Sequence, residues 1–360
     1  MCKVYNSIGC LTEVKSHLAL HNIIDFNSLN EVIDFQKKYN TNRAEIISKH
    51  KILIEQERGQ LTIEIAALEE SIKAYKNMVE KDLLNEIDNL NQKYLAVASK
   101  APLNFIQRFI CYLKKMNLAQ KLRDKQMNFK SKVDDSIRKT FKSFPQKFNR
   151  YQFLISHFEE AVKESCLLPL KELDRKKFII DEVKNSIYGA LGEQKVVNVL
   201  EGLPDDYILI NDFCLSFDKP IYNPQQNQYI NSVQIDHILV SSSGLFLIET
   251  KNWSDNSVNS LSLRSPVEQI CRSNFALFKL LVGAVNTNGI HFDKHHWGKR
   301  KIPIRNLIVL TGSKPKEEFQ YVKILSVSQV PGYVRYFKPS FTNDETEKIA
   351  SYLLSLNERR

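Results

Sequence analysis

Three residues near the middle of the chain have the types and the spacing that could support hydrolysis of a phosphodiester bond. Asp236 lies in one apolar segment, and Glu249 and Lys251 lie in the next. Side chains alternate between the two faces of a strand, so Glu249 and Lys251 share one face. If the intervening turn is centred between Ser242 and Ser243, Asp236 lies directly opposite Glu249. Directly opposed residues have Cβ atoms about 4.5–5.5 Å apart.

Two carboxylates at that separation repel each other unless a cation lies between them. Magnesium fits, because it takes oxygen ligands at about 2.0–2.1 Å. Lys251 would stand beside the ion, where an ammonium group can hold a water or a phosphate oxygen, and a metal and a lysine beside a water are suited to phosphodiester cleavage. A second interpretation stays open, because cross-strand Glu/Lys pairs also occur on solvated sheet faces.

The residues around these acids favour the first interpretation. Both segments are apolar at nearly every position, which is typical of strands in a sheet that is covered on both sides. The apolar neighbours are Ile235, Ile238, Leu239, Val240, Leu245, Phe246, Leu247 and Ile248. Acids buried in such a sheet need a partner or a metal ion.

The same part of the chain carries an ordered set of motifs. Gly189-Ala-Leu-Gly192-Glu193 opens a helical pattern, Asp236-His237 follows, then Ile248-Glu-Thr-Lys-Asn-Trp253, and finally Pro266-Val-Glu-Gln269. In this order the motifs resemble those of the nuclease-related domain (NERD), a branch of the PD-(D/E)xK restriction-endonuclease-like superfamily. The resemblance covers roughly residues 184–325.

The resemblance implies a role for each matching residue. Asp236 and Glu249 match the metal-binding acids, Glu193 matches the acid of the first helix that supports the metal, and Lys251 matches the catalytic lysine. Gln269 matches a glutamine that borders the active site. The family also implies magnesium or manganese, a DNA substrate, and an α/β core with a central mixed sheet flanked by helices.

The fold class that we expect is an all-helical N-terminal region, residues 1–168, followed by a restriction-endonuclease-like α/β domain, residues 169–360. Apolar residues recur at steps of three and four between Leu61 and Tyr94, which predicts one long helix over 41–99. That helix either pairs with a second copy of the chain or folds back on the helices that follow. Pro102 and Pro169 predict breaks. We draw no function from residues 1–40.

The α/β domain is expected to hold a helix ending near Leu200, strands at 207–210, 234–240 and 245–251, and a helix at 267–285. A strand at 304–311, an edge strand at 322–327 and a closing helix at 344–356, capped by Thr342 or Asn343, would complete it. The polar stretch 217–229 is expected to be a long loop, which either contacts substrate or is a neutral insertion.

Positive charge is concentrated in residues 101–150, which hold 13 basic and 3 acidic side chains and so match the net charge of +10 of the whole chain. Such a stretch predicts a phosphate-binding surface, and we expect DNA there rather than an anionic membrane. The expected contacts are Lys114, Lys115, Lys121, Arg123, Lys125, Lys130, Lys132, Arg138, Lys139 and Lys142. Interleaved aromatic residues stack on bases or form the apolar side of the helices.

Other motifs bound the function. The six cysteines are scattered, which favours reduced thiols in the cytoplasm over zinc or a disulfide framework. No apolar stretch is long enough to span a membrane, and no phosphate-binding loop predicts an ATPase, so energy-driven movement would need a partner protein. Residues 291–297 hold three histidines and an aspartate, and we expect a solvated loop there rather than a zinc site.

The sequence therefore predicts a metal-dependent DNA endonuclease, with a role in defence against foreign DNA or in DNA processing. The N-terminal helices would dock DNA and could form a homodimer. The alternative is a scaffold without catalysis, whose nuclease-like core binds nucleic acid or a protein.

Overall fold

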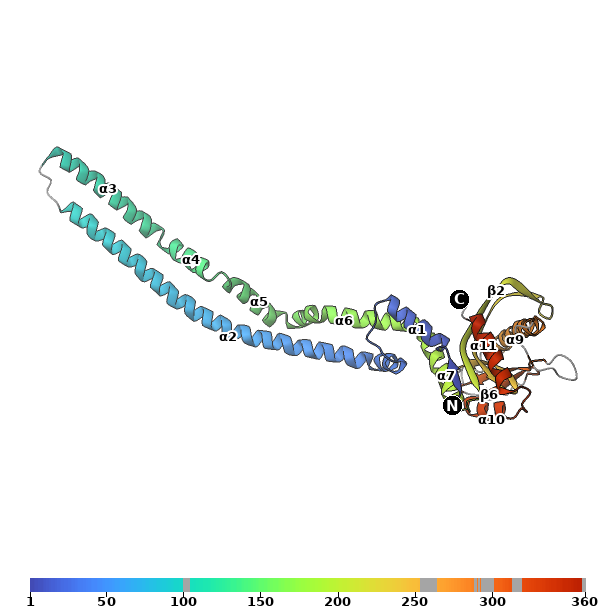
Figure 1. The fold of residues 1–360 in the computed structure, drawn as a ribbon. Coiled ribbons are helices and arrows are strands. Elements are labelled where there is room, and N and C mark those ends of the chain that lie inside the picture. Colours follow the sequence, from blue (N-terminus) through green and yellow to red (C-terminus); the bar gives the residue numbers. More distant parts are fainter. Residues whose placement is uncertain are drawn as a thin grey trace. The chain divides into compact units, whose positions relative to one another are not determined.

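The computed structural model describes residues 1–99, 104–252, 264–287, 290, 292, 301–312 and 319–357. The chain forms two compact units (Figure 1). The α/β unit comprises Met1–Lys38 and Arg175–Arg360, and the helical arm comprises Tyr39–Asp174. The arm is therefore inserted in the sequence of the α/β unit, between its first and its second segment.

The helical arm is an antiparallel hairpin. Its first limb belongs to one helix, and its second limb consists of shorter helices that run back along it. The helices are α2 (Leu29–Ala98), α3 (Phe105–Met127), α4 (Phe129–Thr140), α5 (Phe144–Ser156) and α6 (Phe158–Glu182). Contacts between the two limbs show the antiparallel arrangement. Arg150 binds Glu57 through two nitrogens at 2.8 and 3.0 Å, and farther along the arm the rings of Tyr75 and Phe141 lie 5.7 Å apart.

The apolar periodicity of α2 forms the seam of this hairpin. Ile65 is buried, and the other apolar positions at the expected steps up to Tyr94 are half-buried, whereas nearly all residues between them are exposed. Near the other end of the arm, Ile54 packs with Leu154 and Val162 in a buried cluster. The long helix thus folds back on its own chain, as one of the two expected arrangements requires. Pairing with a second copy stays a prediction.

The expected break at Pro169 is wrong, because α6 continues through this residue and ends at Glu182. A proline inside a helix removes one hydrogen bond and costs about 3 kcal/mol or more. The helix continues because both sides of the proline are packed, with Cys166 buried before it and Leu173 buried after it. The break falls instead at Val183, whose φ of −101° and ψ of 19° separate α6 from α7 (Lys184–Leu200).

The α/β unit is built on one mixed sheet of six strands in the order β1-β2-β3-β4-β5-β6. Strand β3 is antiparallel to both of its neighbours, β2 and β4, while β1 is parallel to β2, and β4, β5 and β6 are parallel. Their bounds are β1 Lys3–Tyr5, β2 Ile208–Asn223, β3 Gln228–Ser241, β4 Gly244–Lys251, β5 Ile304–Leu310 and β6 Val322–Ser326. The expected edge position of β6 is confirmed.

Helices cover both faces of this sheet, which confirms the expected fold class. On one face, Leu245 and Leu247 of β4 pack in a cluster with α9 (Arg264–Asn286) and α11 (Asn343–Asn357). On the other face, Phe246 and Ile248 pack in a cluster with α7 and α10 (Val330–Arg335), which follows the short 3-10 turn η1 (Val327–Gln329). The continuous apolar run of β4 is buried because neither face is open to solvent.

The first residues of the chain belong to the α/β unit. Strand β1 adds an edge to the sheet, with Lys3 paired to Ile208, and α1 (Gly9–Leu20) follows it. Val14 and Leu18 of α1 are buried in a cluster with Ile180 and Ile187. The segment 1–38 therefore completes both the sheet and the layer of helices around α7.

The structure also tests the expected loop at 217–229 and the expected cap of the last helix. The stretch 217–229 is not a loop, because Ile221 pairs with Ile230 and Asn223 with Gln228, which extends β2 and β3 into a hairpin. Thr342 caps α11, since its hydroxyl accepts the N–H of Glu345 at 3.2 Å while the Glu345 carboxylate accepts the N–H of Thr342 at 2.9 Å. Among the described residues, no helix is long and apolar enough to cross a bilayer.

Candidate active site

The pairing of β3 with β4 brings Asp236 to the end of β4. Paired positions run from Ser241 with Gly244 to His237 with Ile248, which confirms the predicted register. Asp236 lies one residue beyond the last pair, and its Oδ2 accepts the backbone N–H of Thr250 at 2.7 Å. This bond fixes the Asp236 carboxylate at the end of the ladder, next to Glu249 and Lys251 of the neighbouring strand.

Glu249 and Lys251 form an ion pair on β4, with Lys251 Nζ 2.7 Å from Glu249 Oε1. Glu249 is almost fully buried at 3% exposure, whereas the Lys251 side chain keeps 28%. Burial by itself lowers the pKa of Lys251, but the charge and the hydrogen bond of Glu249 outweigh it and leave that pKa above its ordinary value. Lys251 is therefore a protonated cation held against an acid.

Glu193 contributes a third carboxylate, from α7. It is 5% exposed, and burial raises its pKa, assisted by the nearby charges of Asp212 and Glu249 and opposed by hydrogen bonds from the thiol and backbone N–H of Cys10. Its Oε2 atom is buried and has no hydrogen-bond partner among the described residues. A buried carboxylate oxygen without a partner costs free energy and is a natural ligand for a cation.

The electrostatics of Asp236 show that the three acids form one cluster. Burial raises the pKa of Asp236 well above its usual range, and the charges of Glu249 and Glu193 raise it further. The Thr250 hydrogen bond and the Lys251 charge oppose this shift without cancelling it. We refer to Asp236, Glu249 and Glu193 as the acidic cluster.

The donor set of the acidic cluster fits a hard divalent cation. All three side chains offer carboxylate oxygens, the ligand type that magnesium and manganese prefer. The orphaned Glu193 Oε2 supplies an acceptor that no protein donor satisfies in the described residues. The cluster is not gathered as tightly as a loaded site, since it is not among the groups of described residues whose ligand atoms all lie within 4.8 Å of one another. The Lys251 ammonium compensates Glu249 in this arrangement.

Two glycines of α7 explain how Glu193 comes so close to the sheet. A Cβ on Gly192 would lie 3.3 Å from Asn252 Cβ and 3.4 Å from Thr250 Cγ2, so a larger residue would press on the end of β4. A Cβ on Gly189 would lie 2.8 Å from Cys10 Sγ. The Gly-x-x-Gly-Glu motif therefore lets α7 approach β4 on one side and α1 on another, which positions the glutamate.

Asn252, directly after β4, hydrogen-bonds to α7 and to the residue that follows β5. Its Nδ2 donates to the Tyr188 carbonyl at 3.1 Å, and its Oδ1 accepts the Thr311 hydroxyl at 2.6 Å. The Thr311 N–H donates to the Lys251 carbonyl at 3.1 Å. These three bonds hold the backbone of Lys251 between α7 and the end of β5.

Sequence reasoning missed the contribution of the N-terminal segment. Cys10, in the first turn of α1, faces Glu193. The helix N-terminus and its N–H groups favour a carboxylate there. Asn6, with a φ of 64°, exchanges hydrogen bonds with Asn211, whose Oδ1 lies 2.8 Å from Nδ1 of the fully buried His237. Since these contacts join segments about 200 residues apart, no local sequence pattern predicts them.

His237 is fully buried in the interior of the α/β unit. Asn211 Nδ2 donates to Asn6, so Asn211 Oδ1 is an acceptor and His237 Nδ1 carries the proton. Burial lowers the pKa of His237 to about 3, so the ring is neutral. The ring is thus an uncharged interior group, and alternation along β3 places it on the face opposite Asp236.

Gln269 is not drawn into the acidic cluster by any described contact. It is half-buried on α9 and lines a polar cavity of about 420 Å³ together with Glu268, Arg272 and, from the turn of the β2–β3 hairpin, Gln226. None of the three acids lines this cavity. The turn of the β2–β3 hairpin, in the stretch 217–229 that was expected to be a loop, therefore lies beside Gln269.

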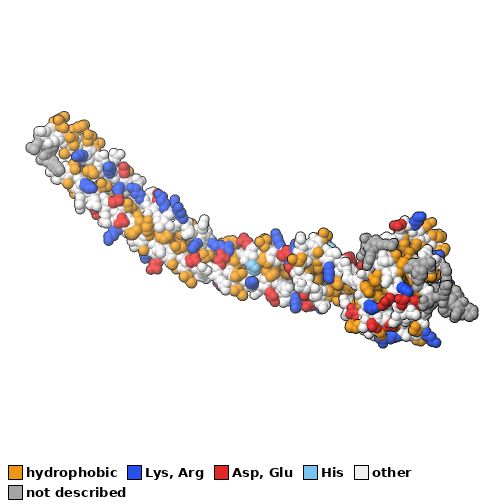
Figure 2. All heavy atoms as spheres, in the orientation of Figure 1, with side chains coloured by type: hydrophobic (Ala, Val, Ile, Leu, Met, Phe, Trp, Pro, Cys, Tyr) orange, Lys and Arg blue, Asp and Glu red, His pale blue; other side chains and the backbone are white. Residues whose placement is uncertain are grey.

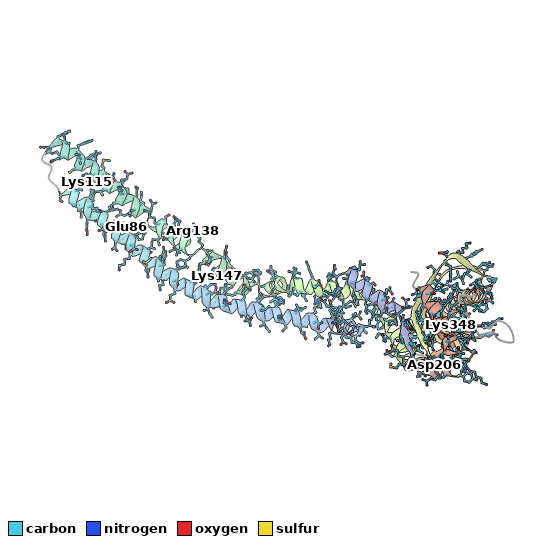
Figure 3. The ribbon with its side chains drawn as sticks, in the orientation of Figure 1. Glu86, Lys115, Arg138, Lys147, Asp206 and Lys348 are labelled. Carbon is cyan, nitrogen blue, oxygen red and sulfur yellow. The ribbon has the colours of Figure 1, made fainter. Side chains whose placement is uncertain are left out.

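Most of the basic residues expected to contact DNA are exposed on α3 and α4, where Figure 2 shows blue side chains along the arm. Figure 3 labels Lys115 on α3, whose ammonium lies 5.5 Å from the Tyr94 ring, and Arg138 on α4. Lys125 is half-buried and ion-paired with Glu86 of α2. The acids of α2 thus neutralise part of the charge, and nine of the ten residues stay exposed.

The aromatic residues of the same segment divide into two sets. Phe141 packs against Tyr75, and the Phe144 and Phe148 rings stack at 5.7 Å. Phe105 and Tyr112, near the start of α3, are exposed. The first set forms the apolar side of the hairpin. His291 and residues 293–297, the expected solvated loop, lie outside the described residues.

The α/β unit is thus a mixed-sheet domain with two buried acids, Glu193 and Glu249, a half-buried acid, Asp236, and a lysine at one end of its central strands. Within it, residues 188–311 match the family model of the nuclease-related domain, NERD, which confirms the resemblance for this part of the chain. No curated protein and no solved structure matches the chain. A nuclease-related function is what the match supports.

Proposed function

We propose that the protein is a metal-dependent DNA endonuclease. The observation that carries this proposal is the convergence of Asp236, Glu249 and Glu193 on one end of the sheet, beside Lys251, in the part of the chain that matches the nuclease-related domain. Like charges held close together destabilise a fold, and an acid whose pKa is raised by its surroundings, as that of Asp236 is, marks a candidate functional site.

Each residue of the site has a role in this proposal. Asp236 and Glu249 would hold magnesium or manganese, and Glu193 would support the ion with its unpartnered oxygen. When bound, such an ion polarises the phosphate and lowers the pKa of a water. Lys251 would hold the attacking water or a phosphate oxygen and stabilise the negative charge that develops there. Gln269 would orient the phosphate or a water from α9 only when bound DNA extends from the acidic cluster to the polar cavity that Gln269 lines.

The exposed basic residues of α3 and α4 support DNA as the substrate. Phosphate contacts supply sequence-independent affinity that falls with salt concentration. Eight exposed cations on α3 and α4, with exposed Lys142 directly after α4, match that requirement, whereas the acidic cluster alone would repel a polyanion. The arm would therefore dock DNA, and the α/β unit would cut it.

The experiment compares plasmid cleavage by the wild type and by Lys251→Ala, with magnesium or manganese. We expect the variant to keep its fold and its DNA affinity and to lose cutting by about 100-fold or more, since one stabilising charge is worth that much at such sites. Lys323→Ala, at an exposed lysine on β6, is the matched control and should cut normally. Normal cutting by Lys251→Ala would show that this site is wrongly assigned.

If neither the wild type nor any variant cuts, the scaffold without catalysis gains support. DNA binding then separates the two cases of that alternative. Binding that falls steeply with salt points to a nucleic-acid scaffold, and its absence points to a protein partner.

A further inference from the structure

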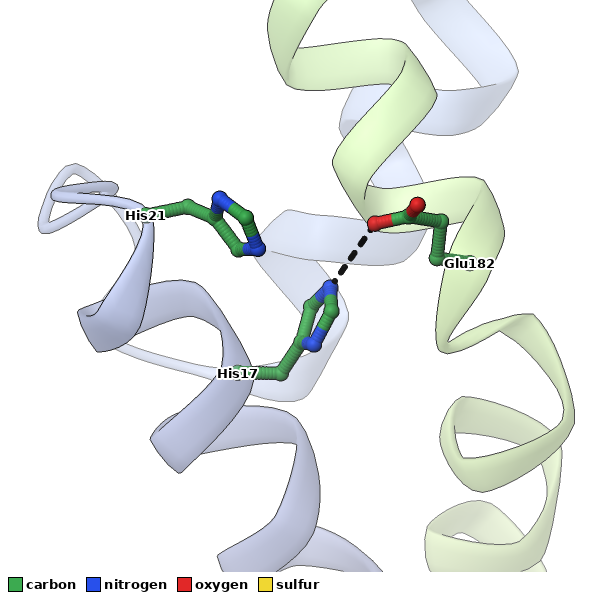
Figure 4. A group of neighbouring side chains, drawn as sticks. All are labelled: His17, His21 and Glu182. Carbon is green, nitrogen blue, oxygen red and sulfur yellow. Dashed lines mark hydrogen bonds and ion pairs between the residues drawn. The ribbon is translucent and has the colours of Figure 1, made fainter.

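A second group of metal-ligating side chains lies apart from the acidic cluster, where α1 and α6 both end. His17 is in the last turn of α1, His21 directly follows that helix, and Glu182 is the last residue of α6. One ligand atom of each residue lies within 4.8 Å of those of the other two. Figure 4 shows both rings extending from α1 toward the Glu182 carboxylate.

The separations among the three side chains are close to those between ligands of one metal ion. His17 Nε2 lies 3.2 Å from Glu182 Oε2, and the centroids of the two imidazole rings lie 4.8 Å apart at an angle of 55°. Ligands bound tetrahedrally to zinc at about 2.0–2.2 Å lie roughly 3.3 Å from each other. One of the three separations has this value, and rotation of the side chains can close the others.

The backbones that carry these ligands are held by apolar packing and not by the ligands themselves. Val14 and Leu18 of α1 are buried against Ile179, Ile180 and Val183 around the end of α6. His17 and Glu182 lie on the rim of this cluster, with 25% and 42% of their side chains exposed. The group is therefore both preorganised and open to an ion from solvent.

An ion pair alone does not account for the group. His17 and Glu182 suffice for an ion pair, and among the described residues no hydrogen bond or ion pair joins the His21 ring to the Glu182 carboxylate, although it lies within reach of both side chains. Two protonated rings at this distance would repel each other. A transition-metal ion uses both imidazoles in their neutral form and the carboxylate as a third ligand.

We propose that His17, His21 and Glu182 form a binding site for a transition-metal ion of the zinc class. Two imidazole nitrogens and one carboxylate oxygen are ligands, and water completes the shell. Magnesium is not expected here, because imidazole is a poor ligand for it. A bound ion would join α1, whose other end faces Glu193, to the end of α6. The site is independent of the proposed nuclease activity.

The test is a calorimetric titration of the metal-free full chain with zinc chloride, in buffer with excess magnesium that occupies the acidic cluster. We expect one ion per chain and a rise in the melting temperature on binding. His17→Gln combined with His21→Gln should weaken binding by roughly 100-fold, and Glu182→Gln by roughly tenfold, because coordination depends on each ligand. His157→Gln removes an exposed histidine of the arm and should change nothing.

Two outcomes overturn the proposal. The wild type fails to bind zinc at micromolar concentration, or the double histidine variant binds it as the wild type does, which would place the ligands elsewhere, for instance among the histidines of 291–296. Circular dichroism of each variant shows whether it is folded. Because none of the three residues belongs to the buried cluster, we expect the variants to fold.

Discussion

Asp236 is the residue at which stability and metal binding oppose each other. In the absence of a cation its half-buried carboxylate lies in a desolvated position near the charges of Glu249 and Glu193, which disfavours its charged form. The same arrangement gives a divalent cation several carboxylates to bind at once. A site of this kind is unstable when empty and stabilised when filled, so its chemistry can be followed through the stability of the fold.

Asp236→Asn should therefore separate these two effects. We expect the metal-free variant to be more stable than the metal-free wild type, because a neutral amide removes one repelling charge. Saturating magnesium or manganese should stabilise the wild type by about 2.7 kcal/mol at a hundredfold excess over the dissociation constant, and the variant far less. Thermal melts with and without metal measure both. Asp218→Asn, at an exposed acid of β2, should behave as the wild type; an undiminished metal effect in Asp236→Asn would contradict the assignment.

Gly189 tests the contact between α7 and the N-terminal segment. Gly189→Ala puts a methyl group 2.8 Å from Cys10 Sγ, and we expect a loss of about 1–2 kcal/mol of stability from the overpacking. In a Cys10→Ala background the same change should be neutral, or stabilising by up to about 1 kcal/mol, because alanine favours a helix over glycine. Denaturant unfolding of the four proteins gives the coupling energy. Additive effects would show that the two residues do not touch.

At the scale of elements, the sequence predicts most of the α/β unit because its signals are local. The apolar segments around Asp236 and Glu249 are separated by a short turn, so their register follows from the turn and is confirmed. The predicted helix cap at Thr342 is also a local signal, and it is confirmed. Local rules fail where distant packing decides, as at Pro169, whose helix is held on both sides by buried residues.

In the candidate site, too, local sequence patterns predict some of the contacts and miss others. The alternation of β4 places Glu249 and Lys251 together, and the structure brings them to 2.7 Å. The contacts of Cys10 and Asn6 could not be predicted, because Glu193 and Asn211 lie about 200 residues away in the sequence. The stretch 217–229 was misjudged because its prolines and asparagines obscure a strand pairing that only the register of β2 with β3 reveals.

The pair of Glu57 and Arg150 joins the two limbs of the arm and makes their association depend on pH. The Arg150 hydrogen bonds hold the pKa of Glu57 below its usual value. The stabilisation is therefore present above the unfolded pKa of about 4.3 and is lost as the pH falls through the lower folded value.

Glu57→Gln should consequently destabilise the arm at pH 7 by less than about 1 kcal/mol, since both side chains are more than a third exposed. At pH 3 the difference from the wild type should largely disappear. Denaturant unfolding followed by helical circular dichroism at both pH values measures it. Glu55→Gln, whose ion pair with Arg58 stays within α2, is the control and should change less. An equal loss at both pH values would show that the charge of Glu57 is irrelevant.

At the scale of the whole molecule, the insertion of the arm predicts that DNA docking and cutting can be separated. Replacing Tyr39–Asp174 by a linker of about six glycines and serines leaves α1, the ends of α2 and α6, and the sheet in place. Such a linker spans the 8–10 Å that separates packed helices. We expect the shortened protein to fold and to cut DNA at low salt, with weaker binding and a smaller dependence of affinity on salt.

Binding of labelled DNA at several salt concentrations measures this change. A full-length variant in which Lys130, Lys132, Lys139 and Lys142 are replaced by glutamine keeps the arm and removes exposed charge, so it should share the weaker salt dependence. Unchanged affinity in both proteins would place the DNA contacts on the α/β unit instead.

The pairing of β1 with β2 has a consequence for how the chain folds. Lys3 and Ile208 are about 200 residues apart, and closing a loop of that length is slow and entropically unfavourable. The arm shortens the path, because its two ends meet where the Tyr39 hydroxyl lies 2.5 Å from Asp174 Oδ1. Once the arm has formed, the effective loop falls to about 70 residues, which reduces the closure cost by about 1 kcal/mol. Strand β1 can therefore pair with β2 at a smaller entropic cost once the inserted arm has formed.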